Sequence, residues 1–435
     1  MPQAGEKISY IKEAQFRECA SVLADALKAV YEEHQALDHF LNKLFRSNPK
    51  YGSKDRRRIG DALFRVFRDY GFLEKLLKKE ERSAENLLIY SSLLAGEKEI
   101  PASRLEKCPL GEKLFLEIAG KENFYARLIT FGKELVAEDN LPRWLLPCFP
   151  SCEAARDVAD SLLERSPLWF RLNFPGDGKK TEKILKEFAV KDIVLLFHPF
   201  KKDAFRIAVD KKVQLQEFVT FRDGLFEIQD LSSQCIGAGY AGEVNNEKHF
   251  SILDCCAGGG GKTLQMASFL HETGTAGKVF AWDIRRNKLE ETFRRGKKAG
   301  LRNIAILESF PAGKKFDKVL VDAPCSGSGR WRRAPEQRFL LTEEELEKVV
   351  SSQLEILENA AKCVKNGGVL VYGTCSVFYR ENMGNIKNFL EKHPEFTLEK
   401  FSSPLTGLLT DGTLSILPSH GDCDGAFVAR MRRIG

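Results

Sequence analysis

Two cysteines in this chain each follow a short apolar run and precede a serine, which is the pattern of a tight polar turn after a buried strand. Cys325 lies in KVLVDAPCSGSGRW, and Cys375 lies in GGVLVYGTCSVFYREN. A thiolate that adds to carbon-6 of a pyrimidine turns carbon-5 into the nucleophilic carbon of an enamine. The same sulfur must leave after the carbon-5 proton is lost, so a second thiol or another acid or base has a role beside it. The pair therefore indicates covalent chemistry at carbon-5 of a pyrimidine base.

Strand and helix patterns alternate around these cysteines in the part of the chain beyond residue 250. Strands are expected at 251–255, 278–283, 303–308, 318–322 and 367–373, with helices at 261–272, 285–300 and 343–364. This alternation predicts an α/β fold with a doubly wound, Rossmann-like parallel sheet. Ligands of such sheets bind beyond the carboxyl ends of the strands, and the distinctive residues of this chain all follow strands. We therefore expect them to converge on one site.

A glycine run in LDCCAGGGGKTLQMA follows the first of these strands and opens a helix. Its backbone N–H groups are expected to approach a ligand closely. A phosphate-binding P-loop requires G-x-x-x-x-G-K-[ST], and counting back from Gly261-Lys262-Thr263 puts Cys256 in place of the first glycine. A P-loop nucleotide hydrolase is therefore disfavoured, whereas a plain tight connection between strand and helix stays open as an alternative.

Asp283 closes the next strand, where a carboxylate can accept hydrogen bonds from both ribose hydroxyls of a nucleoside cofactor. The alternative role of this aspartate is to cap the helix that follows. Together with the glycine run, Asp283 describes a nucleoside-containing ligand. S-adenosylmethionine is favoured because the dinucleotide fingerprint G-x-G-x-x-G is not cleanly present.

Length and composition predict a cytoplasmic protein of two or three domains. The chain has 435 residues, of which 43% are hydrophobic and 29% charged, and no apolar run is long enough to cross a bilayer. The N-terminus is too charged for a secretory signal, and the 11 cysteines are scattered as reduced thiols would be. No cysteine or histidine spacing indicates zinc, so no metal is expected. A net charge of +6 permits a polyanionic partner without predicting one.

Three domains are expected from the chain's pattern, over residues 1–140, 141–235 and 236–435. The first is helical and amphipathic, with Ile59, Leu63, Val66, Phe67 and Tyr70 on one apolar stripe. The second has mixed signals that favour a small α+β subdomain.

Basic residues cluster at three places in the sequence. On the first helical domain, a solvated helix face is favoured over a phosphate-binding patch for Lys54, Arg56, Arg57, Arg58, Arg65 and Arg68. A solvated face is also favoured for the helix that carries Arg285, Arg286, Arg294, Arg295, Lys297 and Lys298. Arg330, Arg332 and Arg333 directly follow the Cys325 turn, where contact with RNA phosphates is favoured instead.

Several segments resemble, in order and spacing, the motifs of the Nop/Sun family of RNA (cytosine-5) methyltransferases. These are QDLSSQ, LDCCAGGGGKT, AWDIRRNKL, FDKVLVDAPCSGSGRWRRAPEQRF, LVYGTCSVFYREN and GAFVARMRR, between residues 140 and 435. The segment DRRRIGDALFRVFRDYGFL is similar to the NusB-like RNA-binding domain of bacterial ribosomal members. The resemblance implies a class I methyltransferase domain after a NusB-like helical domain and an α+β RNA-binding subdomain. It also implies that a monomer uses S-adenosylmethionine to methylate RNA, with 16S ribosomal RNA as the expected substrate.

The resemblance also implies roles for individual residues. Cys375 takes the part of the nucleophile, Cys325 helps the product leave, and Asp322 contacts the ring N3 and exocyclic amino group of cytosine as well as the cofactor. The implied cofactor-binding residues are Cys256, Ala257, Gly258, Gly259, Gly260, Gly261, Lys262, Asp283 and Glu308. One departure is that Gly258, Gly259 and Gly260 stand where the family usually has Ala-Pro-Gly.

Two other classes of protein stay open at this stage. One is a noncatalytic RNA-binding or ribosome-assembly factor with a methyltransferase fold, which need not bind S-adenosylmethionine. The other is a DNA cytosine-5 methyltransferase, although that class takes its nucleophile from a Pro-Cys motif alone and lacks the second cysteine turn.

Overall fold

The computed structural model describes residues 13–96, 104, 109, 117–118, 120–131, 134–208, 213–239 and 250–434. The predictions made for the charged N-terminus and for most of the helical pattern between 97 and 119 fall outside these ranges. The chain folds into two compact units. The first holds Met1–Pro147, Ala159–Arg165 and Trp331–Leu341, and the second holds Cys148–Val158, Ser166–Arg330 and Thr342–Gly435. The three domain boundaries expected from the sequence stay a prediction.

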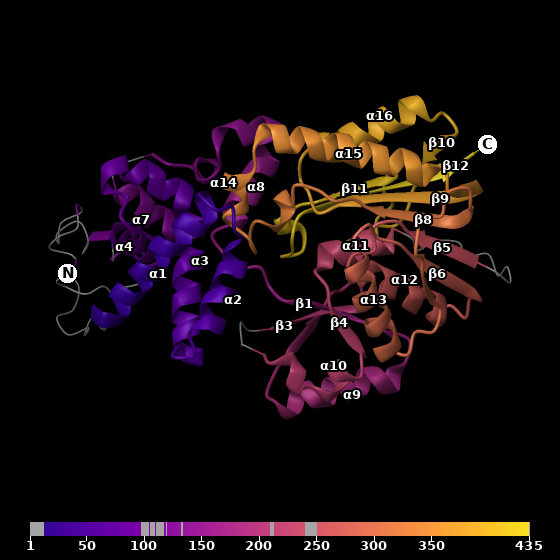
Figure 1. Ribbon diagram of the computed structural model, residues 1–435, viewed down its shortest axis with the longest axis horizontal. Helices are drawn as coiled ribbons and strands as arrows, with labels where there is room; N and C mark the ends of the chain where they lie inside the picture. Colours follow the sequence, from indigo (N-terminus) through magenta and orange to yellow (C-terminus); the bar gives the residue numbers. More distant parts are fainter. Residues whose placement is uncertain are drawn as a thin grey trace. The chain divides into compact units, whose positions relative to one another are not determined.

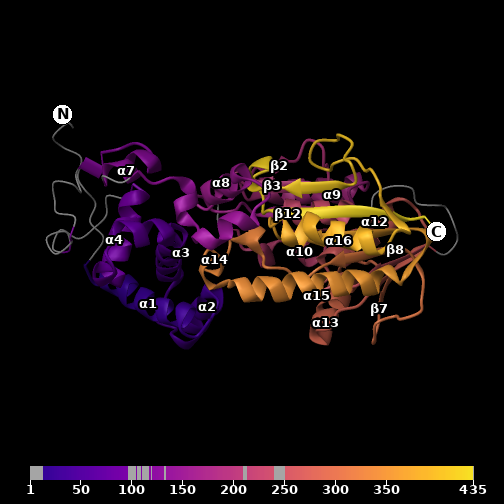
Figure 2. The same ribbon diagram turned by 90° about the horizontal axis from the view of Figure 1, so that it is seen from above.

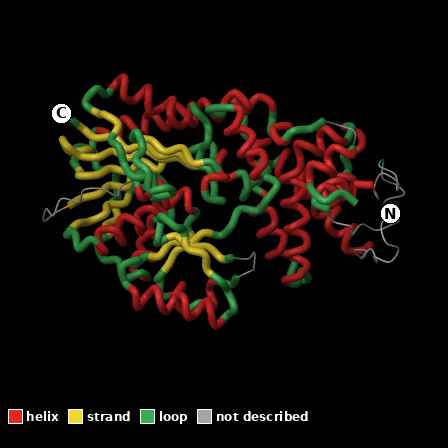
Figure 3. The backbone as a smooth tube through the Cα atoms, turned by 180° about the vertical axis from the view of Figure 1, so that it is seen from behind, coloured by secondary structure: helices red, strands yellow, loops and turns green. Residues whose placement is uncertain are grey.

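In its described residues the first unit contains helices and connecting loops but no β-strand, as Figure 3 shows by colour. Its helices are α1 (Glu13–Tyr31), α2 (Leu37–Ser47), α3 (Ser53–Leu76), α4 (Ala84–Leu94), α7 (Phe124–Thr130) and the short α14 (Gln337–Leu340). The apolar stripe predicted on α3 is buried, because Ile59, Leu63, Val66 and Phe67 are all 0% exposed. These side chains pack with those of α1 and α4 into one core, which confirms the amphipathic pattern.

Several basic residues of the first unit are used internally. Arg58 pairs with Glu18 and Asp55 at 2.8 and 3.0 Å, and Arg65 donates to Ser92. The solvated face predicted for this helix therefore holds for Arg57, whose side chain is 64% exposed, and is wrong for Arg58.

The segment Trp331–Leu341, which follows the Cys325 turn in sequence, belongs to the first unit. Arg338 is fully buried there and donates to the carbonyl oxygens of Asn140 and Arg68 at 3.0 and 2.7 Å. Arg332 is 4% exposed, and its Nη2 donates to the Arg165 carbonyl oxygen at 3.0 Å. The prediction that Arg332 meets RNA phosphates is wrong, because the side chain is buried and its guanidinium bonds a backbone carbonyl group of the first unit. Arg330 is exposed, as that prediction requires.

The second unit is built on an eight-stranded sheet (Figures 1 and 2). Its strands are β5 (Phe250–Asp254), β6 (Gly277–Ala281), β7 (Ile304–Ile306), β8 (Phe316–Asp322), β9 (Val364–Thr374), β10 (Phe396–Leu398), β11 (Thr413–Ile416) and β12 (Ala426–Arg433). The order is β10-β12-β9-β8-β5-β6-β7, with β11 also paired to β12. The run from β9 to β7 is parallel, as predicted, and the pairings made by β12 are antiparallel.

Helices cover both faces of this sheet (Figure 1). One face carries α15 (Glu343–Ala361) and α16 (Asn385–Lys392), and the other carries α11 (Leu231–Ala238), α12 (Gly261–Glu272) and α13 (Arg286–Lys298). The central strands are apolar on both sides, as shown by Val319, Leu320 and Val321 of β8, which are all 0% exposed. The α/β prediction is therefore confirmed.

A separate four-stranded antiparallel sheet precedes the large one in the sequence. Its order is β2-β3-β1-β4, from β1 (Trp169–Leu172), β2 (Leu195–Phe197), β3 (Ala204–Ile207) and β4 (Phe226–Ile228). The helices of this region are α8 (Cys152–Ser161), α9 (Gly178–Val190) and α10 (Val219–Arg222). Phe170, Phe205 and Phe226 of the sheet pack against Phe188 of α9, which gives the small sheet a core of its own.

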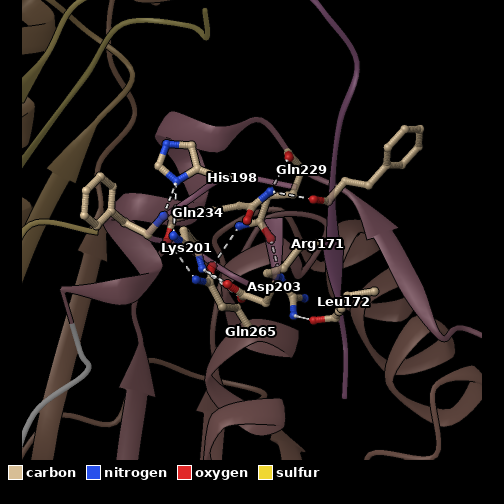
Figure 4. A network of polar contacts seen from close by, with 10 residues as sticks. Arg171, Leu172, His198, Lys201, Asp203, Gln229, Gln234 and Gln265 are labelled. Atoms are coloured by element: carbon tan, nitrogen blue, oxygen red, sulfur yellow. Dashed lines mark hydrogen bonds and ion pairs between the residues drawn. The ribbon is translucent and has the colours of Figure 1, made fainter. Parts of the chain in front are cut away.

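A buried polar network ties the small sheet to helices of the large one (Figure 4). Arg171 of β1 donates to Gln229 at 2.7 Å, and Gln229 donates to Gln265 of α12 at 2.9 Å. Gln265 in turn donates to the carbonyl oxygen of Gln234 on α11 at 2.8 Å. Gln229 and Gln234 are the two ends of the QDLSSQ motif. Since buried polar groups need partners, these glutamines fix α11 and α12, which carry residues of the site, to the small sheet.

No helix in the described ranges is long and apolar enough to span a membrane.

Candidate active site

The two cysteine turns meet at the carboxyl ends of the adjacent parallel strands β8 and β9. The Sγ atoms of Cys325 and Cys375 lie 3.0 Å apart, and both residues are half-buried. The strands dictate this proximity, because Asp322 at the end of β8 pairs in register with Gly373 near the end of β9. The sequence places these cysteines 50 residues apart, and the sheet brings them into contact.

The two thiols differ in electrostatic environment. A hydrogen bond from Cys325 lowers the pKa of Cys375 below its usual value in spite of burial, and the charges of Arg330 and Lys262 act in the same direction. The same hydrogen bond raises the pKa of Cys325 well above its usual value, and burial and the charge of Glu381 add to this. The pair therefore favours a Cys375 thiolate that accepts a hydrogen bond from the Cys325 thiol.

Asp322 lies at the end of β8 and pairs with a lysine of the glycine-rich motif LDCCAGGGGKT. Lys262, at the start of α12, places its Nζ 2.7 Å from Oδ2 of Asp322 and donates to Ser233 of α11 at 2.9 Å. The Asp322 side chain is 30% exposed, so a ligand can reach it. In the described part of the chain, Oδ1 of Asp322 has no hydrogen-bond donor and is available to accept one.

The glycine turn runs from the end of β5 to the first residue of α12. Gly260 has a φ of 84°, and a Cβ there would approach Thr292 of α13 to 2.6 Å, so no larger residue fits. The Thr292 hydroxyl donates to the Gly258 carbonyl oxygen at 3.1 Å, and Arg295 donates to that of Gly259. The outer side of the turn is open, because a Cβ on Gly261 would meet nothing within 4 Å.

Asp283 follows β6 and faces this turn. Its Oδ2 accepts a hydrogen bond from the Gly258 N–H at 2.8 Å, and its Oδ1 accepts one from the backbone N–H of Arg285, also at 2.8 Å. Burial opposes ionisation of this carboxyl, but the hydrogen bonds from Arg285 and Gly258 hold its pKa below the usual value. An ionised carboxylate, an open glycine turn and the N-terminus of α12 together fit a nucleoside cofactor.

The remaining cofactor residues expected from the sequence lie around the same edge. Cys256 and Ala257 form the first part of the glycine turn, with Cys256 half-buried and Ala257 8% exposed. Glu308 follows β7, is exposed, and accepts a hydrogen bond at its carbonyl oxygen from Arg286. Its contact with the cofactor stays a prediction.

Arg295 links the glycine turn to the small sheet. Its guanidinium donates to the Gly259 carbonyl oxygen and lies 2.8 Å from Glu227 of β4, with the two side chains only 20% and 7% exposed. The solvated helix face predicted from the sequence is therefore wrong for Arg295. It holds for the neighbouring Arg294, which is 72% exposed and pairs with Glu291 on its own helix.

We expect the Arg295→Gln variant to bind S-adenosylmethionine roughly tenfold more weakly, since losing a charged hydrogen bond costs about 1.5 kcal/mol or more. Titration calorimetry measures this dissociation constant directly. Arg294→Gln is the matched control, because its charge loss is the same and its side chain does not touch the turn. Equal affinities for the Arg295→Gln and Arg294→Gln variants would show that the turn does not depend on this contact.

Asp254, at the end of β5, is 1% exposed and accepts a hydrogen bond from the Thr263 hydroxyl at 2.7 Å. Burial raises its pKa from 3.8 to about 7. The folded protein therefore binds a proton between about pH 4 and pH 7 that the unfolded chain does not hold, and stability falls as pH rises through this window. The difference between these two pKa values limits the contribution of Asp254 to the free energy of unfolding to about 4 kcal/mol.

The Asp254→Asn variant keeps an acceptor for Thr263 and removes the buried charge. We expect its melting temperature to exceed that of the wild type at pH 8 and the difference to shrink at pH 5. Differential scanning calorimetry at the two pH values checks this. A difference that is the same at both would contradict the pKa of about 7 for Asp254.

Sequence reasoning missed several residues of this site. Ser233 and Glu381 lie within the quoted motifs QDLSSQ and LVYGTCSVFYREN, so the motifs were the available signal. Thr292 and Arg295 lie on α13 outside any motif, and only the packing of that helix on the glycine turn brings them to the site.

Comparison with known proteins agrees with this fold and identifies the family. Residues 242–432 match the family model described as 16S rRNA methyltransferase RsmB/F. The ribosomal RNA small subunit methyltransferase B of Klebsiella pneumoniae (strain 342) is 27% identical over 454 residues, covering 94% of this chain and 97% of that protein. The probable ribosomal RNA small subunit methyltransferase B of Bacillus subtilis (strain 168) is 33% identical over 318 residues, covering 70% and 68%.

A solved structure shares the whole fold. The crystal structure of PH0851 matches with a TM-score of 0.72 at 20% identity, covering 98% of this chain and 100% of that one. The fold and the cysteine pair define a class of enzyme, the S-adenosylmethionine-dependent RNA (cytosine-5) methyltransferases. Within this class, the chain belongs to the 16S rRNA methyltransferase RsmB/F family.

Proposed function

We propose that this chain methylates carbon-5 of a cytidine in 16S ribosomal RNA through a transient covalent bond between Cys375 and carbon-6 of the base. The observation that carries the proposal is the pair of half-buried thiols 3.0 Å apart, next to the Asp322–Lys262 pair. The names of the relatives, which are small-subunit ribosomal RNA methyltransferases, support the substrate.

The first step is attack of the Cys375 thiolate on carbon-6, which forms a C–S bond and moves the ring electron pair onto carbon-5. Asp322 accepts a hydrogen bond from the exocyclic amino group and from the N3–H group that forms when N3 takes up a proton from solvent during the attack, which draws electrons from the ring. N3 returns this proton to solvent when the ring double bond is restored. Lys262 holds the Asp322 carboxylate in place for this contact. Uracil has a carbonyl group in place of the amino group, so cytosine is preferred.

When bound, S-adenosylmethionine supplies the methyl group for carbon-5, and we assign its binding to residues 256–262, Asp283, Glu308 and Asp322. A base then takes the carbon-5 proton, the electrons of that C–H bond restore the ring double bond, and the C–S bond breaks. Cys375 leaves as a thiolate, and the Cys325 thiol stabilises it by donating a hydrogen bond. A base within a duplex cannot reach either thiol, so the target cytidine must be single-stranded or flipped out.

We assign RNA binding to the helical first unit and to the small antiparallel sheet. Arg330 is exposed, follows the Cys325 turn in the sequence, and acts electrostatically on Cys375. We assign to it a contact with a phosphate of the target strand. The protein is proposed to act as a cytoplasmic monomer, and light scattering of the purified protein checks its mass.

Methyl transfer by the purified protein tests the proposal. The protein is incubated with labelled S-adenosylmethionine and with free 16S rRNA, 30S particles, 23S rRNA or single-stranded DNA, and 5-methylcytidine is mapped by bisulfite sequencing. The expected result is a discrete methylated cytidine in 16S rRNA and none in DNA. Methylation of 23S rRNA alone would overturn the substrate, and binding of S-adenosylmethionine without any transfer would favour the noncatalytic assembly factor.

A further inference from the structure

Glu381 is a buried acid next to the thiol pair with no role in the steps above. It lies on a single turn of π-helix, Arg380–Gly384, directly beyond the Cys375 turn, and it is 0% exposed. Across the described ranges, no lysine, arginine or histidine lies within ion-pair distance of its carboxylate. A buried carboxylate without a cation is costly, and π-turns occur frequently at functional sites.

Hydrogen bonds from both cysteine turns satisfy this carboxylate. Its Oε1 accepts from the Ser326 backbone N–H at 2.8 Å and from Gln353 of α15 at 2.9 Å. Its Oε2 accepts from the Ser326 hydroxyl at 2.5 Å and from the Ser376 hydroxyl. Ser326 and Ser376 directly follow Cys325 and Cys375 in sequence. One carboxylate therefore ties together the two turns that carry the thiols.

The surrounding contacts hold Glu381 itself in place. The Tyr372 hydroxyl of β9 donates to the Glu381 carbonyl oxygen at 2.6 Å. The neighbouring Asn382 accepts from the Thr374 hydroxyl at 2.6 Å and donates to the Ser376 carbonyl oxygen at 2.9 Å. The π-turn is thus fastened to the Cys375 turn on both sides of the acid.

The charge of Glu381 also distinguishes the two thiols. It is among the groups that raise the pKa of Cys325, whereas the nearby charges with the largest effect on Cys375 are Arg330, Asp322 and Lys262. A negative charge that acts on one thiol favours the protonated form of that thiol.

We propose that Glu381 is a positioning residue that fixes the distance between the two cysteine turns and keeps the shared proton on Cys325, so that Cys375 is the nucleophile. This inference rests on the proposed function, since it explains which thiol attacks in that reaction. The contact from Gln353 of α15 comes from outside both turns and holds the carboxylate to a helix that neither turn belongs to.

Alkylation of the full-length protein by iodoacetamide, without RNA or S-adenosylmethionine, tests the inference. Tandem mass spectrometry measures the rates at Cys375 and Cys325 between pH 5 and pH 9. In the wild type we expect Cys375 to react faster below pH 8. In Glu381→Gln this preference is expected to fall roughly tenfold, the equivalent of one pKa unit, with partial recovery in Glu381→Asp. The matched control is Glu347→Gln, an exposed acid that pairs with Arg380 beside Glu381.

Methylation kinetics provide the second readout. The kcat of Glu381→Gln should fall roughly a hundredfold with the KM for RNA unchanged, because the thiols are misplaced and RNA contacts are not.

Two serine variants replace Glu381→Gln in the alkylation experiment if that variant does not fold. Ser326→Ala and Ser376→Ala each remove one hydroxyl contact with Glu381, and each is expected to reduce the preference for alkylation at Cys375 by less than Glu381→Gln would. A wild-type Cys375 preference in Glu381→Gln, or in both serine variants, overturns the inference. The alkylation experiment needs no RNA, so its outcome is independent of the proposed function. If the wild type methylates no RNA, the proposed function is refuted, but a reduced Cys375 preference in Glu381→Gln still supports the inference.

Discussion

The Cys375→Ala variant is expected to lose RNA methylation by roughly 10⁴-fold or more while it still binds S-adenosylmethionine with wild-type affinity. The loss is large because the proposed mechanism makes carbon-5 of cytosine nucleophilic only through attack of this thiolate on carbon-6. Incorporation of labelled methyl groups into 16S rRNA measures the rate, and titration calorimetry measures cofactor binding. The binding readout separates loss of chemistry from loss of folding.

Cys152→Ala is the matched control for this variant, because Cys152 is an exposed thiol at the start of α8. It should methylate RNA at the wild-type rate. If Cys375→Ala retained even a tenth of wild-type activity, the assignment of Cys375 as the nucleophile would be wrong.

The Cys325→Ala variant is expected to accumulate a covalent complex between the protein and its RNA. The attacking thiol is still present, but the departing sulfur loses the hydrogen bond that stabilises it as a thiolate. The same loss removes the contact that lowers the pKa of Cys375, so the complex should form more slowly at pH 7 than at pH 9. A denaturing gel with labelled RNA shows the complex as a band of reduced mobility.

Two further variants decide how this band is interpreted. The double variant Cys325→Ala/Cys375→Ala should give no band, because the attacking sulfur is absent. A band that persists in the double variant would mean that another residue forms the bond. Turnover of Cys325→Ala at the wild-type rate without a band would mean that Cys325 has no part in release.

The sequence was sufficient to predict the parallel part of the large sheet and the edge where the site lies. Apolar runs that end in Asp254, Asp322 and Thr374 are strands buried on both faces, and parallel strands put their carboxyl ends on one edge. The proximity of Cys325 and Cys375 follows from that geometry. The antiparallel addition of β10, β11 and β12 was not predicted, because strand direction depends on pairing partners rather than on the local pattern.

The interpretation of charged residues from the sequence was less successful. Arg294 and Arg295 are adjacent on one helix, yet one is solvated and the other joins the glycine turn to the small sheet. Arg332 was expected at an RNA surface and is instead a buried side chain that donates to a backbone carbonyl group in the first unit. Glu381 accepts hydrogen bonds from two turns that are 50 residues apart in sequence. In each case the partner is supplied by tertiary packing, which helical or strand periodicity does not encode.

The most direct measurement uses a 16S rRNA substrate in which 5-fluorocytidine replaces cytidine. The fluorine at carbon-5 cannot leave as a proton does, so the covalent complex persists in the wild-type protein after methyl transfer. Digestion with protease and nuclease followed by tandem mass spectrometry identifies the modified residue. We predict the methylated 5-fluorocytidine on Cys375. A nucleotide on Cys325, or normal methylation of 16S rRNA with no covalent complex on the fluorinated substrate, would contradict the proposed mechanism.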